Sequence, residues 1–141
     1  MNVNDFILDS DFSDVLIVGR SLGTGPASYH SSLLNGKNDL ILISPFSSLL
    51  SLVRKHYPIY PVSLLLKKNF DNLGFLKNFS GKLLIISAEN DEIISRNYSY
   101  EFFEKLGIED SEFFIGYGEE HNSLMLNDLV LDKVRDFSRV G

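Results

Sequence analysis

The chain contains no cysteine among its 141 residues. That absence excludes disulfide bonds, thiolate metal sites, cysteine nucleophiles and palmitoylation of the chain itself. Basic residues are also in the minority, with 13 Lys and Arg against 19 Asp and Glu and a formal net charge of −6. An acidic chain is poorly suited to a phosphate backbone, so the sequence argues against nucleic acid as a partner.

Long apolar runs and an amino-terminal signal peptide are missing as well. No run approaches the roughly 18 residues that a membrane span requires. Residues 1–14, MNVNDFILDSDFSD, carry acids where a signal peptide needs basic residues. The sequence therefore predicts a cytoplasmic protein with no membrane span. With 44% hydrophobic and 23% charged residues, the composition is that of an ordinary globular protein with one domain over residues 1–141.

Short, continuous apolar runs recur along the chain, at residues 15–18, 40–43, 83–86 and 113–115. Such runs are typical of strands buried on both faces in parallel sheets. Segments that could form helices lie at residues 22–35, 96–106 and 122–138, and the first two stop before Gly36 and Gly107. Residues 46–79 predict only short helices, because prolines interrupt them. The pattern indicates an α/β fold with about four parallel strands and helices on both faces.

Ligands of such sheets bind beyond the carboxyl ends of the strands, so the residues after each run are candidates for a site. The first run leads into Gly19-Arg20-Ser21-Leu22-Gly23. A nucleophilic serine needs a sharp strand-to-helix turn, whose crowded backbone the two glycines would allow. Ser21 is thus a candidate nucleophile, and the backbone N–H of Leu22 a candidate oxyanion donor. The alternative is a glycine-rich turn with a solvated serine.

The loops after the third and fourth runs supply the remaining candidates. Asp91 could orient a catalytic imidazole, although Glu89 and Glu92 are neighbours that could serve, and a solvated acidic loop is the alternative. His121 suits a general base, the alternative being a polar residue at a helix start. The other histidines, His30 and His56, are expected to be structural or exposed. No metal-ligand spacing occurs, and the chemistry needs no cofactor.

Residues 19–26 resemble the GRS-(I/L)-G-x-G-P nucleophile elbow of α/β-hydrolases related to palmitoyl-protein thioesterases. Residues 42–49 are similar to the SPF-(T/S)-S segment of that group, and the loops at 90–94 and 118–122 resemble its acid and histidine loops. The resemblance implies a serine hydrolase in which Ser21, Asp91 and His121 form the triad. It also implies carboxylic esters or acyl thioesters as substrates and an acyl-enzyme intermediate.

The family fold has further strands before the elbow, whereas only residues 1–14 precede the first run here. The resemblance therefore implies a partial α/β-hydrolase fold, the C-terminal half, without the N-terminal strands. No residue matches the second oxyanion donor of the family. The strand before Ser21 would present an unpaired edge, which predicts a possible homodimer through that edge.

Two other functions remain open. The chain could be a non-catalytic hydrolase remnant that acts as an interaction or dimerisation module. It could also be a flavodoxin-like or phosphate-binding domain, because glycines recur at positions 19, 23 and 25 before a helix. The lysine of the G-x-x-x-x-G-K-[ST] loop and the spacing of G-x-G-x-x-G are both missing, which argues against that function.

Overall fold

A computed structural model describes residues 3–10, 12, 14–34, 36–56 and 69–139. Its centre is a four-stranded, fully parallel sheet. The strands are β1 (Leu16–Arg20), β2 (Asp39–Ile43), β3 (Leu83–Ala88) and β4 (Ser111–Gly116). Each strand contains one of the predicted apolar runs in whole or in large part, so the α/β fold with about four parallel strands is confirmed.

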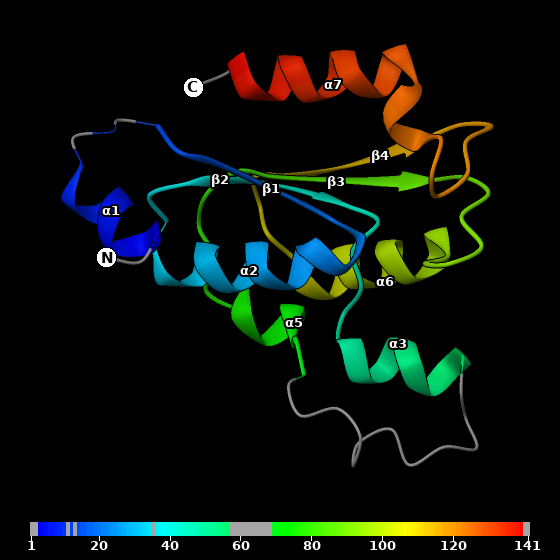
Figure 1. Ribbon diagram of the computed structural model, residues 1–141, viewed down its shortest axis with the longest axis horizontal. Coiled ribbons are helices and arrows are strands. Elements are labelled where there is room, and N and C mark those ends of the chain that lie inside the picture. The colour runs from blue at the N-terminus through cyan, green and yellow to red at the C-terminus, as the bar shows by residue number, and fades with distance from the viewer. Residues whose placement is uncertain (1–2, 11, 13, 35, 57–68, 140–141) are drawn as a thin grey trace.

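Helices cover both faces of this sheet, as Figure 1 shows in a nearly edge-on view. On one face lie α2 (Thr24–Leu33), α3 (Leu49–His56), α5 (Asn72–Phe75) and α6 (Arg96–Leu106). On the other face lies α7 (Asp128–Arg139). Because the connections from β1 to β4 run over the same face, each right-handed crossover adds the next strand on the same side. The strand order in space therefore equals the order in the chain.

The hydrophobic core has two layers that meet at β2 and β3. Alternate residues of these strands point to opposite faces, and both strands are almost completely buried because helices cover both faces. Toward α2, α5 and α6 the buried side chains are Ala27, Leu40, Leu42, Leu76, Phe79, Leu83, Ile85 and Phe102. Toward α7 they are Ile41, Ile43, Leu84, Ile86, Ala88, Leu124 and Val130.

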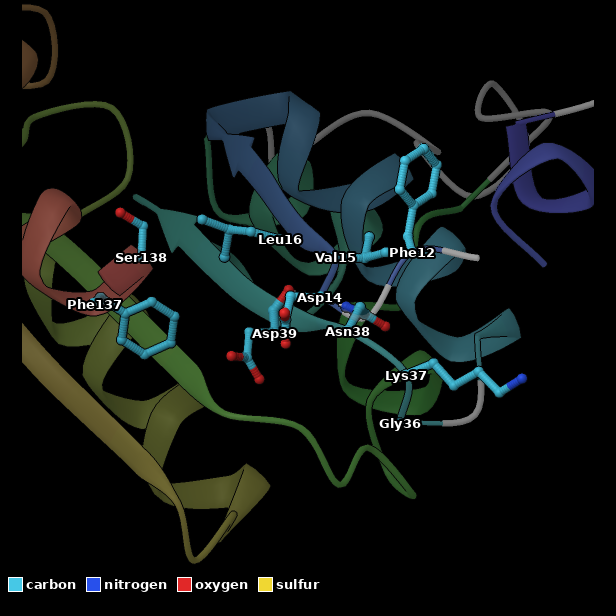
Figure 2. Close-up of a pocket in the computed structure, with 10 residues that line it drawn as sticks. All are labelled: Phe12, Asp14, Val15, Leu16, Gly36, Lys37, Asn38, Asp39, Phe137 and Ser138. Atoms are coloured by element: carbon cyan, nitrogen blue, oxygen red, sulfur yellow. Dashed lines mark hydrogen bonds between the residues drawn. The ribbon is translucent and has the colours of Figure 1, made fainter. Parts of the chain in front are cut away.

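The outer strand β1 is less covered than its neighbours. Its Ile17 packs against the α2 layer, but Leu16 and Val18 remain 37% and 52% exposed. Val18 lies opposite Ile41 in the sheet, so it faces the α7 side, where α7 does not reach it. A cavity of about 520 Å³ lies where β1 and β2 begin and α7 ends, with Leu16, Asp39 and Phe137 among its lining residues (Figure 2).

Several boundaries differ from the sequence prediction. The helix predicted at residues 22–35 is divided into η1 (Ser21–Gly23) and α2. The helix predicted at 122–138 is divided into η2 (Leu124–Leu126) and α7, because Asn127 Oδ1 accepts the N–H groups of Leu129 and Val130 at 2.9 and 3.3 Å and so caps α7.

The helix α6 agrees with its predicted bounds, and the helix α1 (Val3–Asp9) is not predicted. The helix α6 spans the predicted residues 96–106 and ends at Gly107, whose φ of 57° is left-handed. The sequence pattern predicts no element at residues 3–9, where the structure has the helix α1.

In the ranges that the structure describes, no helix combines the length and the apolar character needed to cross a membrane.

Candidate active site

Ser21 occupies a sharp turn at the carboxyl end of β1. Its φ of 51° is uncommon for a residue with a Cβ atom. Gly19 lets the strand approach α2 closely, since a Cβ there would lie 2.5 Å from Ala27 Cβ and 2.8 Å from the carbonyl oxygen of Gly23. Gly23 itself has open space around its Cβ position and an ordinary φ of −64°. The expectation that crowding requires both glycines is therefore wrong for Gly23.

Buried polar groups hold this turn from the side of the helices. The Thr24 hydroxyl donates to the carbonyl oxygen of Ser21 at 2.7 Å. The amide of Asn72 donates to Thr24 Oγ1 at 3.2 Å and to the carbonyl oxygen of Phe46 at 2.9 Å. Leu22 lies in the first turn of η1, where a backbone N–H has no acceptor within the helix. Among the residues that the structure describes, no backbone acceptor is found for that N–H, so it can serve a ligand at this end of the sheet.

Asp91, in the loop after β3, is buried and has every carboxylate acceptor position used. Its Oδ1 accepts the N–H groups of Ile93 and Ile94 at 3.0 and 2.7 Å. Its Oδ2 lies 2.9 Å from the hydroxyl of Ser44, which donates to it, and 2.8 Å from Nδ1 of His121. A carboxylate has about four acceptor positions, so its orientation is fully determined by these contacts.

His121, in the loop after β4, is 8% exposed and packs its ring against Asp91. Because an ionised carboxylate can only accept, the contact at 2.8 Å requires a proton on Nδ1. In the neutral ring this tautomer leaves Nε2 as an acceptor, which is the form that a general base needs. The buried pair therefore presents a proton acceptor at the carboxyl edge of the sheet.

Among the described residues, the other candidate acids and the other two histidines make no hydrogen bond to the His121 ring. Glu92 is exposed, and Glu89 Oε2 accepts the backbone N–H of Gly118 at 2.8 Å rather than contacting His121. His30 lies within α2 beside Tyr29, with ring centroids 5.6 Å apart. His56 is exposed at the end of α3, and its Nε2 lies 3.1 Å from the carbonyl oxygen of Ile93.

Glu119 stabilises the loop that carries His121. Its carboxylate accepts the Ser123 hydroxyl and, at 2.9 Å, the amide of Asn127. These hydrogen bonds to the charged form lower the pKa of Glu119 below its ordinary value of 4.5. The backbone N–H of Asn90 donates to the carbonyl oxygen of Glu119 at 2.9 Å, which ties the Asp91 loop to the His121 loop.

Arg20 connects the elbow to this pair. Its Nη2 donates to the backbone carbonyl oxygen of His121 at 2.8 Å, across a sequence separation of 101 residues. Among the hydrogen bonds of the described residues, none joins the Ser21 hydroxyl to the imidazole ring. The structure thus pairs Asp91 with His121 directly and links the residue before Ser21 to the histidine loop.

Sequence reasoning missed two of these contacts. Ser44 follows β2 and lies in the segment that resembles SPF-(T/S)-S, and the rule that sites lie beyond strand ends indicates it as a site residue. Arg20 belongs to the elbow motif, which by itself predicts no contact with His121. Neither contact partner could be identified from local spacing, because Asp91 and His121 lie far away in the chain.

The hollow beside His121 is small. It measures about 130 Å³ and is lined by Asn90, Glu92, Ile93, Glu120, His121 and Asn122. The larger cavity of Figure 2 lies at the amino ends of β1 and β2, whereas the candidate site lies beyond the carboxyl ends of the strands. None of the candidate residues lines that cavity. Within the described residues, no group of three or more His, Asp or Glu side chains is arranged to hold a metal ion.

Solved structures with similar folds include esterases. Est1E from Butyrivibrio proteoclasticus matches 96% of this chain and 65% of its own, with a TM-score of 0.70 at 16% identity. A structure reported with carboxylesterases of Nitrososphaera gargenis matches 98% of this chain and 69% of its own, with a TM-score of 0.68 at 14% identity. No protein-family model matches the chain.

Sequence comparison also finds a protein that is named a hydrolase. A protein of Acanthamoeba polyphaga mimivirus that is named an alpha/beta hydrolase is 23% identical over 134 residues, which are 95% of this chain and 48% of that protein. An uncharacterized protein of Mycobacterium tuberculosis is 28% identical over 131 residues, 92% of this chain and 46% of that protein. The chain spans about half the length of these curated relatives. Its fold is therefore that of part of an α/β-hydrolase.

Proposed function

We propose that this chain carries the catalytic residues of a serine hydrolase that cleaves carboxylic esters or acyl thioesters. One observation carries the proposal: the buried hydrogen bond between Asp91 and His121 lies at the same edge of the sheet as the left-handed turn at Ser21. In this proposal Ser21 is the nucleophile, His121 the general base and Asp91 the acid that orients the imidazole.

The proposed reaction has two halves. The Ser21 hydroxyl oxygen attacks the carbonyl carbon of the substrate while His121 Nε2 takes the hydroxyl proton, and the negative oxygen that forms accepts the N–H of Leu22. The carbon–oxygen or carbon–sulfur bond then breaks, the leaving group takes the proton from His121, and the acyl group remains on Ser21. Water repeats the attack with the same proton transfers, which releases the acid and restores the serine.

Apolar side chains around the site favour an acyl substrate. Leu22, Ile93 and Tyr117 are exposed in the loops after β1, β3 and β4, at the carboxyl edge of the sheet. The similarity to esterases supports carboxylic esters, and Est1E has also been solved with ferulic acid bound, at a TM-score of 0.73. The resemblance to the palmitoyl-protein thioesterase-like group supports acyl thioesters as the other class.

The outer edge of β1 is a candidate surface for dimerisation. Val18 and Leu16 are partly exposed on an edge strand, whose outer N–H and C=O groups can pair with another strand. We propose that a second copy of the chain pairs there. The cytoplasmic location stays a prediction.

A fluorophosphonate probe tests the proposed function, because it forms a bond only with an activated serine. The purified chain should be labelled, and Ser21→Ala should abolish the labelling. The matched control is Ser138→Ala, an exposed serine on α7, which should label like the wild type. Undiminished labelling of the Ser21→Ala variant, or none of a wild type with a cooperative thermal transition, would contradict the proposal. The second result would favour the non-catalytic interaction module.

A further inference from the structure

Ser44 lies where β2 ends and turns toward the candidate site. Its backbone N–H still donates to the carbonyl oxygen of Ile86 on β3, at 2.8 Å. Its φ is 50°, a value that a residue with a Cβ atom seldom adopts, and its side chain is 99% buried, with 1% of the residue exposed. A serine held in this conformation inside the protein needs a compensating interaction.

That interaction is the contact with Asp91. The Ser44 hydroxyl donates to Oδ2 at 2.9 Å, and this oxygen is the one that also accepts from His121 Nδ1 at 2.8 Å. The second carboxylate oxygen is held by the backbone N–H groups of Ile93 and Ile94. Ser44 is therefore the only side chain besides His121 that is hydrogen-bonded to Asp91 among the described residues.

We propose that Ser44 is a positioning residue of the hydrolytic reaction, acting through Asp91 on the imidazole of His121. This inference rests on the proposed function. The hydroxyl fixes the plane of the carboxylate, so that Oδ2 stays aligned with Nδ1 while the ring gains and loses its proton.

Loss of the hydroxyl has two consequences that can be measured separately. Oδ2 loses one of its two hydrogen-bond donors, so the carboxylate is held less firmly against Nδ1, and kcat falls while KM stays near its wild-type value. The hydrogen bond between Nδ1 and Oδ2 is also weakened, so the resonance of the Nδ1 proton of His121 moves upfield or broadens.

Other charged groups near the pair are unchanged by such a substitution. Arg20, from β1, donates to the carbonyl oxygen of His121. Glu92 and Glu120, from the loops after β3 and β4, line the hollow beside the ring. His56, from α3, contacts the carbonyl oxygen of Ile93. Because these groups are present in both proteins, a shift between wild type and variant reports the Ser44 hydroxyl.

Two substitutions separate the hydroxyl from the strained backbone. Ser44→Gly removes the hydroxyl and suits a positive φ, whereas Ser44→Ala removes it and keeps the unfavourable backbone. If the hydroxyl acts as proposed, both variants lose about tenfold in kcat on an ester substrate, with KM unchanged. Ser51→Ala, an exposed serine on α3, is the control and should keep the wild-type kcat.

Nuclear magnetic resonance of the Nδ1 proton of His121 gives a second readout that needs no turnover. An upfield shift or broadening of this resonance in both variants supports the inference even where the wild type proves inactive, so a failure of the proposed function is recognised separately. Wild-type kinetics and a wild-type Nδ1 resonance in both variants would overturn it. So would a defect in Ser44→Ala alone, because that result assigns the effect to backbone strain.

Discussion

Arg20 is the residue that links the candidate nucleophile to the candidate base. It directly precedes Ser21, and its guanidinium donates to the carbonyl oxygen of His121. In the sheet Arg20 lies opposite Ile43, so its side chain starts on the α7 face. A hydrogen bond from a charged donor is about twice as strong as a neutral one, so this single contact is an effective link between the end of β1 and the His121 loop.

We expect Arg20→Met to slow the labelling of Ser21 by the fluorophosphonate probe by about tenfold, because the His121 loop loses its charged donor. The methionine keeps much of the side-chain length but cannot donate. Labelling rates at several probe concentrations measure the effect. Arg135→Met is the control, since Arg135 is exposed on α7 and its guanidinium donates to Asp132 of the same helix. Equal rates in the wild type and Arg20→Met would show that the tie is dispensable.

The packing of β1 on α2 depends on one glycine of the elbow. A Cβ at Gly19 would lie 2.9 Å from Thr24 Cα, in addition to its clashes with Ala27 and the Gly23 carbonyl oxygen. A backbone atom cannot move aside as a flexible side chain can. The strand and the helix would therefore have to separate, which would also displace the turn at Ser21.

We expect Gly19→Ala to lower the free energy of unfolding by about 1–3 kcal/mol, the usual effect of overpacking a tight contact. Gly23→Ala is the matched control: its Cβ position is open and its φ is −64°, so its stability should stay close to that of the wild type. Urea denaturation followed by circular dichroism measures both. Equal losses in the two variants would mean that the contact of β1 with α2 is not as tight as described.

The elements that sequence could predict are those whose signal is local. The runs that became β2 and β3 are apolar throughout because helices cover both faces, and α6 ends where Gly107 takes a left-handed φ. The sequence pattern does not predict the division of the last helix, which results from the capping of Leu129 and Val130 by the side chain of Asn127. The contact of Ser44 with Asp91 spans 47 residues, and no spacing rule predicts such a contact.

At the scale of the whole molecule, the outer edge of β1 is the proposed surface for association, because its Leu16 and Val18 are exposed. We expect the wild type to sediment as a dimer at micromolar concentration and Val18→Lys to sediment as a monomer, because a charge on an edge strand opposes pairing with another strand. Analytical ultracentrifugation distinguishes the two. Leu126→Lys, an exposed apolar position in η2, should leave the dimer intact. A monomeric wild type would contradict the proposed pairing.

The strand order β1-β2-β3-β4 also has a consequence for biosynthesis. Each strand pairs with the one made just before it, so the sheet can grow step by step while the chain leaves the ribosome. His121 follows β4, the last of the four strands to be made, and its hydrogen bond to Arg20 joins the two sides of the site across 101 residues. On the proposed function, a nascent chain would carry its nucleophile from an early stage yet remain inert until β4 joins the sheet. Enzymatic activity would thus report that β4 has paired with β3.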